Sequence, residues 1–272
     1  MAKRCMLALV ALASTTERRD VGPVDAWQVE SVRVTAFRRA APQKVVATAW
    51  EEIVGAPPEV VTSAPRERTH QAEGPYELGR LALQEQPDRG DVVYFAAADG
   101  PVDPSSGPFN VLGPCTEVVA KFAPLAKRWL GDLGVDLNRL AFGMVLRLPA
   151  GSREEGYEAL GRFLHDIRID PTGSSDFLYQ INRWRPSQQQ KEVAINRLSK
   201  WTVSRIVHTR LMAGGETLAA SPIVELGHAV RAELDINTAA TVDAKLDAKR
   251  AAAVLDEEIA LALEIATKGD VP

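Results

Sequence analysis

Residues 176–210 read DFLYQINRWRPSQQQKEVAINRLSKWTVSRIVHTR, and this segment constrains the fold more than any other part of the chain. Apolar and polar residues alternate on both sides of the sequence RPSQQQ, a pattern typical of two strands joined by a turn. The triplet Ile-Asn-Arg occurs once in each predicted strand, at 181–183 and 195–197. Because short turns join antiparallel neighbours, we expect an antiparallel sheet.

A hairpin centred near Gln189 would place Asn182 opposite Asn196 and Arg183 opposite Ile195. Side chains alternate between the two faces of such a hairpin. One face would carry Tyr179, Ile181, Arg183, Ile195, Arg197 and Trp201. The other face would carry Gln180, Asn182, Trp184, Ala194, Asn196 and Leu198. The repeated triplet is then a cross-strand pairing of asparagines rather than a duplicated binding motif.

The rest of the chain predicts strands interspersed with helices, in the order β-α-β-β-α followed by β-α-β-β-β-α. Further strands are expected at 26–38, 77–86, 91–98, 138–150 and 217–236, the last with a break at Pro222 as an alternative. Helices are expected at 43–55, 116–133, 153–167 and 243–267. Residues 56–76 contain four prolines, and we expect a loop there. This order indicates an α+β fold with antiparallel sheets and helices packed on one face. Two halves with a shared plan, 26–135 and 136–272, would follow an extension at 1–25.

The N-terminal sequence MAKRCMLALVALAS leaves two interpretations open. A basic start, a short apolar run and small residues after it are typical of a signal peptide, so residues 1–13 predict a secreted protein in one interpretation. In the other, the two cysteines, Cys5 and Cys115, are reduced thiols of a cytoplasmic protein. The cytoplasmic interpretation is the one we adopt. No apolar run reaches the ~18–20 residues of a membrane span, so no membrane is expected as a partner.

Motifs of the common enzyme classes are missing from the sequence. It contains no glycine-rich dinucleotide or phosphate loop and no zinc-protease or serine-hydrolase signature. His165, Asp166, Asp170 and Asp176 together contain metal-binding groups. However, His165 and Asp166 would point about 100° apart at a helix end, because successive helical residues do. We therefore predict no catalytic residue, no metal and no cofactor.

The hairpin segment is strongly basic within a chain of net charge −4. Between Arg183 and Arg210 there are seven cations and one acid, Glu192. Arginine and tryptophan are frequent anchors of protein interfaces, whereas cations with aromatic rings also bind nucleic acid. A third interpretation is a solvated sheet edge on which cations prevent aggregation. The candidate binding residues are Asn182, Arg183, Trp184, Arg185, Lys191, Asn196, Arg197, Lys200, Trp201 and Arg205.

These residues predict a non-catalytic binding or assembly protein. Its partner would be another protein or a second copy of the chain, with nucleic acid as the alternative. The acidic segments 232–247 and 255–264 could instead pair with the basic hairpin, within one chain or across a dimer. A different hypothesis is an enzyme or small-molecule binder with a pocket between sheet and helices, lined by Asn182, Asn196, His208 and His228.

Three short phrases carry a family resemblance: VRVTAF at 32–37, INRLSKW at 195–201 and LDINT at 234–238. Through them the chain resembles an uncharacterised, sporadically distributed bacterial family of similar length, often found in mobile or defence-like genomic contexts. The resemblance spans roughly residues 28–268 and implies no catalytic residues. It implies a component of a bacterial defence-like system. The long N-terminal extension departs from the family, and the resemblance weakens the signal-peptide interpretation.

Overall fold

The structure is a computed structural model and describes residues 24–40, 44–97, 109–208, 211–214, 217–220, 224–240 and 245–271. Within these residues the chain forms an α+β fold with a large antiparallel sheet and four α-helices, which confirms the predicted fold class. The predicted targeting segment and Cys5 lie outside the described residues.

The main sheet has ten strands, and every neighbouring pair runs antiparallel. Its order is β2 (Val60–Ala64), β3 (Thr69–Tyr76), β4 (Gly79–Glu85), β5 (Arg89–Phe95), β1 (Gln28–Arg38), β7 (Leu137–Ala150), β12 (Val224–Thr238), β9 (Ala194–His208) and β8 (Leu178–Pro186). The short β6 (Gly113–Pro114) also pairs with β1, at its first residues Gln28 and Val29. The single 3-10 turn η1 (Val24–Ala26) precedes β1. β10 (Leu211–Gly214) and β11 (Thr217–Ala220) form a separate two-stranded sheet. Because β1 pairs with β7, both predicted halves contribute to one continuous sheet.

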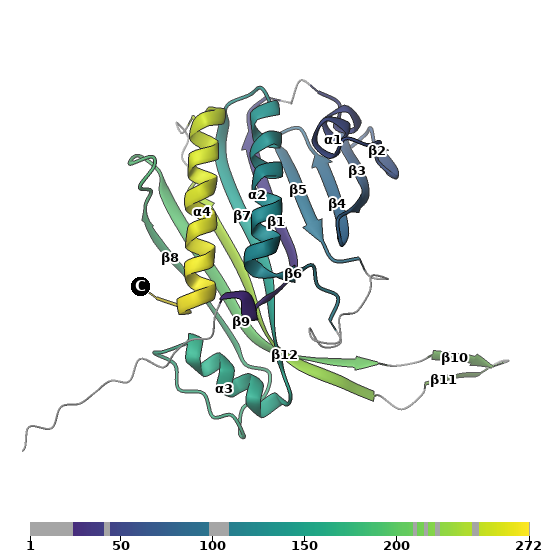
Figure 1. Ribbon diagram of the computed structural model, residues 1–272, viewed down its shortest axis with the longest axis vertical. Coiled ribbons are helices and arrows are strands. Elements are labelled where there is room, and N and C mark those ends of the chain that lie inside the picture. Colours follow the sequence, from purple (N-terminus) through teal and green to yellow (C-terminus); the bar gives the residue numbers. More distant parts are fainter. Residues whose placement is uncertain are drawn as a thin grey trace, which may run out of the picture.

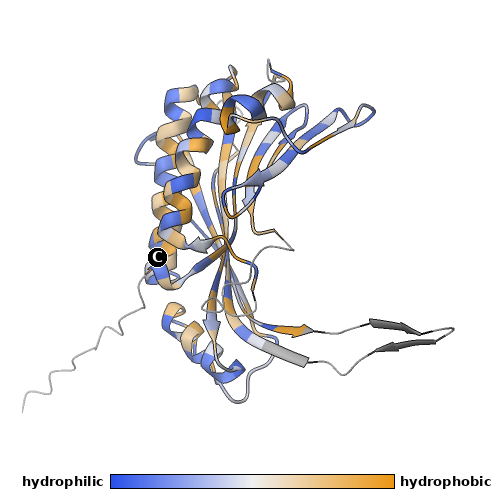
Figure 2. Ribbon diagram, turned by 45° about the vertical axis from the view of Figure 1, so that its right-hand side comes forward, coloured by the Kyte–Doolittle hydropathy of each residue, from blue (hydrophilic) through white to orange (hydrophobic). Residues whose placement is uncertain are grey.

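The helices lie on one face of this sheet, as the sequence predicted (Figure 1). They are α1 (Val46–Val54), α2 (Cys115–Asp132), α3 (Arg153–Phe163) and α4 (Ala248–Lys268). The central pair, α2 and α4, buries an apolar stripe against the middle strands, with Phe122, Trp129 and Leu255 at most 1% exposed. Burying each such side chain stabilises the fold by about 1.5–3 kcal/mol. Figure 2 shows the opposite face of the sheet without a helix, and we call it the helix-free face.

An aromatic cluster joins α3, α4 and the hairpin at one end of the core. The ring of Phe163 lies 5.0 Å from Trp27 and 5.6 Å from Trp201. Trp27 Nε1 donates a hydrogen bond of 2.8 Å to the carbonyl of Ala266 in α4. Gly269, which ends α4 with φ +79°, is needed here because a β-carbon would overlap with the carbonyl of Phe163.

A buried ion pair fixes the turn between β4 and β5. Arg38 is 1% exposed, pairs with Glu85 and donates a 2.8 Å hydrogen bond to the carbonyl of Gln86. Burial raises the pKa of Glu85, against the lowering influence of the Arg38 guanidinium. The end of β1 is thus held to the turn that follows it in the sheet.

One prediction of the strand pattern is wrong. Residues 56–76 form β2 and β3 rather than a loop. Pro57 and Pro58 precede β2, Pro65 lies in the turn between the strands, and Pro75 lies in β3 beyond the residues that pair with β2. The strand predicted at 217–236, with its alternative break at Pro222, is divided into β11, which ends at Ala220, and β12, which begins at Val224. The remaining predicted strands and helices are present, with ends that differ by a few residues. Ser152 caps the N-terminus of α3, since its Oγ accepts a hydrogen bond from the Glu155 amide at 3.1 Å.

Candidate functional site on the helix-free face

The hairpin β8–β9 exists, but its predicted register is wrong by two residues. Arg183 pairs with Arg197 and Trp184 with Asn196, so Asn182 does not lie directly opposite Asn196. The closing pair is Pro186 with Ala194, which centres the turn one residue later than predicted. A shift of two preserves the faces, because side chains alternate with a period of two. The predicted division of side chains between the faces is therefore confirmed.

The predicted cationic face points toward α4 and the C-terminal residues instead of toward solvent. Arg183 donates from Nε and Nη2 to Asp270, at 2.7 and 3.0 Å. Arg197 is 6% exposed and donates to the carbonyl of Val271 at 3.1 Å. Trp201 is fully buried in the aromatic cluster. The protein itself thus covers Arg197 and Trp201, whereas the paired Arg183 side chain remains 27% exposed.

The hairpin turn is bound by a carboxylate from α4. Ser187 Oγ donates to Glu257 Oε2 at 2.6 Å, and the amide of Gln188 donates to Oε1 at 2.9 Å. Arg185 Nη2 lies 3.5 Å from the same carboxylate. Burial would raise the pKa of Glu257, but these hydrogen bonds and the nearby cation outweigh it and lower the pKa. The predicted pairing of the hairpin with the acidic segment 255–264 thus occurs within one chain.

The other predicted cations are divided between separate places. Lys191 is exposed in the turn, whereas Arg205 is exposed near the far end of β9. Lys200 lies on the helix-free face, where its Nζ is 3.1 Å from Glu233 Oε1. The structure therefore does not bring the predicted basic residues together into one patch.

The helix-free side of the hairpin keeps the residues that remain accessible. Trp184 is 70% exposed and Leu178 is 58% exposed, both on β8. All four other tryptophans of the chain are at most 1% exposed. Beside Trp184, Asn182 Nδ2 donates to Asn196 Oδ1 at 3.2 Å, so the two asparagines meet diagonally across the strands.

This amide contact is the first step of a chain of hydrogen bonds across the helix-free face. Asn196 Nδ2 donates to Asn237 Oδ1 at 3.1 Å, and Asn237 Nδ2 donates to Asp235 Oδ1 at 2.8 Å. Every amide donates in the same direction, toward the Asp235 carboxylate. The chain therefore connects the exposed edge of the sheet with its middle.

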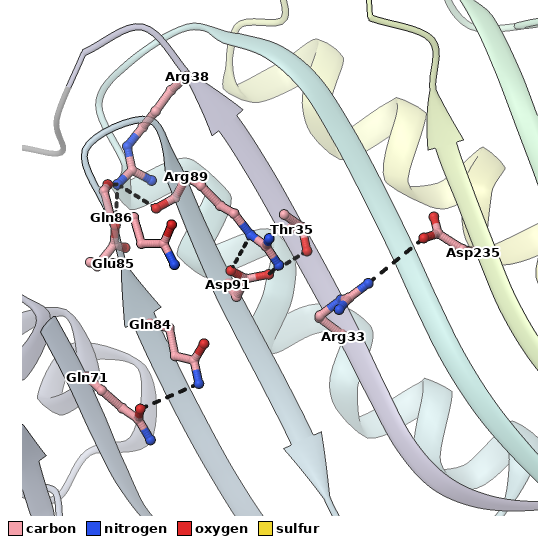
Figure 3. A network of polar contacts seen from close by, with 10 residues as sticks. All are labelled: Arg33, Thr35, Arg38, Gln71, Gln84, Glu85, Gln86, Arg89, Asp91 and Asp235. Atoms are coloured by element: carbon pink, nitrogen blue, oxygen red, sulfur yellow. Dashed lines mark hydrogen bonds and ion pairs between the residues drawn. The ribbon is translucent and has the colours of Figure 1, made fainter. Parts of the chain in front are cut away.

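A cavity of about 410 Å³ lies on the helix-free face above the central strands. Its position follows from the register, which aligns Arg33, Gly143 and Asp235 in one row on β1, β7 and β12. Figure 3 shows Arg33 extended toward Asp235, and Arg33 Nη2 lies 3.9 Å from Asp235 Oδ2. The lining residues are Ser31, Arg33, Val93, Gly143, Met144, Val145, Gln180, Leu198, Lys200, Glu233, Leu234 and Asp235.

Most charges around this cavity are paired with one another. Asp91 accepts hydrogen bonds from Thr35 Oγ1 at 2.5 Å and from Arg89 Nε at 2.7 Å (Figure 3). Glu233 is shared by Lys200 and Arg231, and they lower its pKa although its burial acts in the opposite direction. The helix-free face is thus polar and close to electrically balanced, with an apolar floor at its centre.

The alternative pocket between sheet and helices does not form from its predicted residues. Asn182 and Asn196 lie on the helix-free face, whereas His228 is 7% exposed on the opposite side of β12, next to α3. The side chain of His208 lies outside the described residues. The described residues include no group of three or more histidine, cysteine, aspartate or glutamate side chains that could hold a metal ion. None of the helices in the described part of the chain has the length and apolar character that a membrane crossing requires.

No family model matches the chain, and no curated protein matches it in sequence. The family resemblance of its three short phrases remains a prediction. The central cavity was not predicted either, because its lining comes from six strands whose order the sequence does not show. One signal was present: Gly143 is a lone glycine inside a long apolar strand, which indicates close approach of another group.

Proposed function

We propose that this chain is a non-catalytic binding protein that holds a partner protein against β8 and the helix-free side of the β8–β9 hairpin. Trp184 carries the proposal, because a tryptophan that is 70% exposed is costly to hydrate and is a frequent anchor of protein interfaces. The Asn182–Asn196 contact lies next to it, and Leu178 lies on the same face six residues away along β8. Together they supply an apolar anchor with adjacent amide groups.

The position of β8 at the end of the sheet supports the same proposal. Among the described residues β8 pairs only with β9, so the outer side of its backbone has no neighbouring strand. Such an edge can accept an extended segment of a partner through main-chain hydrogen bonds. Pro186 marks one end of the accessible edge, since proline lacks an amide hydrogen.

The electrostatics favour a protein over nucleic acid as the partner. Arg183, Arg185 and Lys200 already have carboxylate partners within the chain, so they supply little surplus charge for phosphates. The resemblance to a bacterial family found in defence-like contexts agrees with a cytoplasmic component of a larger assembly. A second copy of the chain is one such partner.

Iodide quenching of tryptophan fluorescence tests this proposal, because Trp184 is the one tryptophan that a surface quencher can reach. Products of neighbouring genes, and the chain itself at increasing concentration, are added to the purified protein. We expect a true partner to shield Trp184 from iodide and to bind Trp184→Ala at least about tenfold more weakly, a loss of ~1.4 kcal/mol.

Leu78→Ala is the matched control, since Leu78 is also 63% exposed but lies in the turn between β3 and β4. It should bind each partner as the natural chain does. A partner that binds Trp184→Ala with unchanged affinity, or leaves Trp184 open to iodide, would contradict the proposal.

A further inference from the structure

We propose that the cavity above Gly143 is a separate site for a small zwitterion of about dipeptide size, carrying an ammonium group, a carboxylate and an apolar side chain. The site goes beyond the partner surface at Trp184, and it requires no second protein. Its volume of about 410 Å³ lies within the range of small-molecule sites.

The floor of the cavity is built from small and apolar side chains in a ring of long polar ones. Gly143 has no side chain. Val145, two residues further along β7, and Val93 on β5, which pairs with Arg33, are short and half-buried. Leu198 extends this apolar floor toward the hairpin. An apolar ligand group that covers these residues would displace water from them, at about 25 cal/mol per Å² of apolar surface.

Two pairs of opposite charge stand on this floor in adjacent rows. Arg33 and Asp235 are 3.9 Å apart in one row, and Lys200 and Glu233 are 3.1 Å apart in the next. With two cations and two carboxylates, the cavity can bind both ends of a zwitterion. A simple anion would have to approach both carboxylates, and a simple cation both basic groups, so neither is matched as well.

The Arg33–Asp235 pair is the most open to a ligand. The 3.9 Å between Arg33 Nη2 and Asp235 Oδ2 is longer than a hydrogen bond. The two side chains are 40% and 39% exposed, respectively. Arg33 Nε is buried and has no hydrogen-bond partner among the described residues. A ligand carboxylate would therefore bind the exposed part of the guanidinium and not the buried Nε.

The amide chain from the hairpin fixes the orientation of the acidic partner. Because Asn237 Nδ2 donates to Asp235 Oδ1, that oxygen is held in place and Oδ2 faces Arg33. Arg139 in turn donates to Asn237 Oδ1 at 2.9 Å. The acceptor for a ligand ammonium is thus positioned before any ligand arrives, which reduces the entropy lost on binding.

Isothermal titration with leucyl-alanine tests the site, together with its amidated form, which lacks the carboxylate, and its acetylated form, which lacks the ammonium. Acetate and methylammonium are titrated as control ligands that carry only one charged group each. We expect the free dipeptide to bind, and each blocked form to bind at least about tenfold more weakly, because each loses one charged contact.

Two isosteric or near-isosteric variants assign the charges. Arg33→Gln should remove the difference between the free and the amidated dipeptide, whereas Asp235→Asn should remove the difference between the free and the acetylated dipeptide. Arg80→Gln is the matched control, because Arg80 lies on the same face but is paired with Glu59 and Glu73 outside the cavity. It should leave all affinities unchanged, and circular dichroism checks that each variant is folded.

Three outcomes would overturn the site. The first is no heat of binding for any of the three dipeptide forms at millimolar concentration. The second is equal affinity for the free and blocked forms, which would make the charges irrelevant. The third is unchanged binding in Arg33→Gln and Asp235→Asn, which would place the ligand elsewhere. None of these results depends on Trp184, so loss of the partner surface and loss of this site are distinguishable.

Discussion

Arg33 on β1 and Asp235 on β12 approach to 3.9 Å although the strand β7 runs between them. Neighbouring strands are about 4.8 Å apart, so a side chain must cross roughly two such spacings to make this contact. Gly143 occupies the intervening position in the same row, and a β-carbon there would lie 3.4 Å from Arg33 Nη2. The absence of a side chain at Gly143 therefore allows the Arg33 side chain to extend across β7, close to the backbone of the sheet.

Substitution of Gly143 should separate folding from binding. We expect Gly143→Ala to fold normally and to gain up to about 1 kcal/mol in the free energy of unfolding, because alanine loses less chain entropy than glycine. The β-carbon would meet the flexible end of Arg33 at 3.4 Å and the Leu234 carbonyl at 3.7 Å, which is ordinary van der Waals contact. Gly143→Leu should displace Arg33 and fill the cavity floor. Urea unfolding and dipeptide titration measure both effects. Retained dipeptide binding in a folded Gly143→Leu protein would contradict the cavity's role.

Glu257→Gln should loosen the hairpin turn. Glu257 is 7% exposed, and its carboxylate accepts hydrogen bonds from Ser187 Oγ and the Gln188 amide. A hydrogen bond to a charged group contributes roughly 1.5–3 kcal/mol, and glutamine can keep a part of these bonds. We expect a net loss of about 1–3 kcal/mol in the free energy of unfolding at pH 7.

The pH dependence of this loss follows from the lowered pKa of Glu257. A carboxyl group whose folded pKa is depressed stabilises the fold above its unfolded pKa, and that stabilisation disappears as the pH falls through the folded value. The difference between the natural chain and Glu257→Gln should therefore shrink below about pH 4.5, the ordinary value for a glutamate. A difference that is constant from pH 7 to pH 3 would argue against the charged contact.

Alternation of residue types was sufficient to predict the hairpin and the division of its side chains between two faces. It could not predict which face the helices cover. Arg183 and Arg197 belong to types that usually face water, yet residues 270 and 271 accept their hydrogen bonds from far along the chain. Such long-range pairing leaves no local pattern in the sequence. The misplaced register has a similar cause, because Glu257 on α4 binds the turn.

Proline content led to the error at residues 56–76, where turn residues and strand residues alternate closely. The central cavity could not be located because it requires the order β5, β1, β7, β12, β9 and β8, which places strands from both ends of the chain side by side. The one local signal in the sequence is the lone glycine of β7, Gly143, which does not identify the group that approaches it. Local chemistry therefore predicted the elements, whereas the site depends on how the sheet is assembled.

Glu258→Gln should have the opposite effect to Glu257→Gln, although the two residues are adjacent. Glu258 is fully buried, and its burial together with the negative charge of Asp235 raises its pKa well above the ordinary value. The folded chain thus keeps a proton that the unfolded chain releases, so stability falls as the pH rises from about 4.5 toward the folded pKa.

Glutamine removes this penalty, and we therefore expect Glu258→Gln to raise the free energy of unfolding at pH 8. At pH 4 the gain should vanish, because both states of the natural chain then hold the proton. Urea titrations at the two pH values measure it, with Glu257→Gln as the control of opposite sign. Destabilisation at pH 8 would show that Glu258 is charged and paired in the folded chain.

Trp184 and Trp201 lie on the two strands of one hairpin, and their truncation should separate surface from core. Trp201 is fully buried against Phe163 and Trp27, so Trp201→Ala should lower the free energy of unfolding by about 3–5 kcal/mol. Trp184 is 70% exposed, and Trp184→Ala should change it by no more than about 0.5 kcal/mol. Urea unfolding followed by circular dichroism compares the two variants. If Trp184→Ala were as destabilising as Trp201→Ala, the indole would be a part of the folded core, and its loss of partner binding could no longer be attributed to a surface contact.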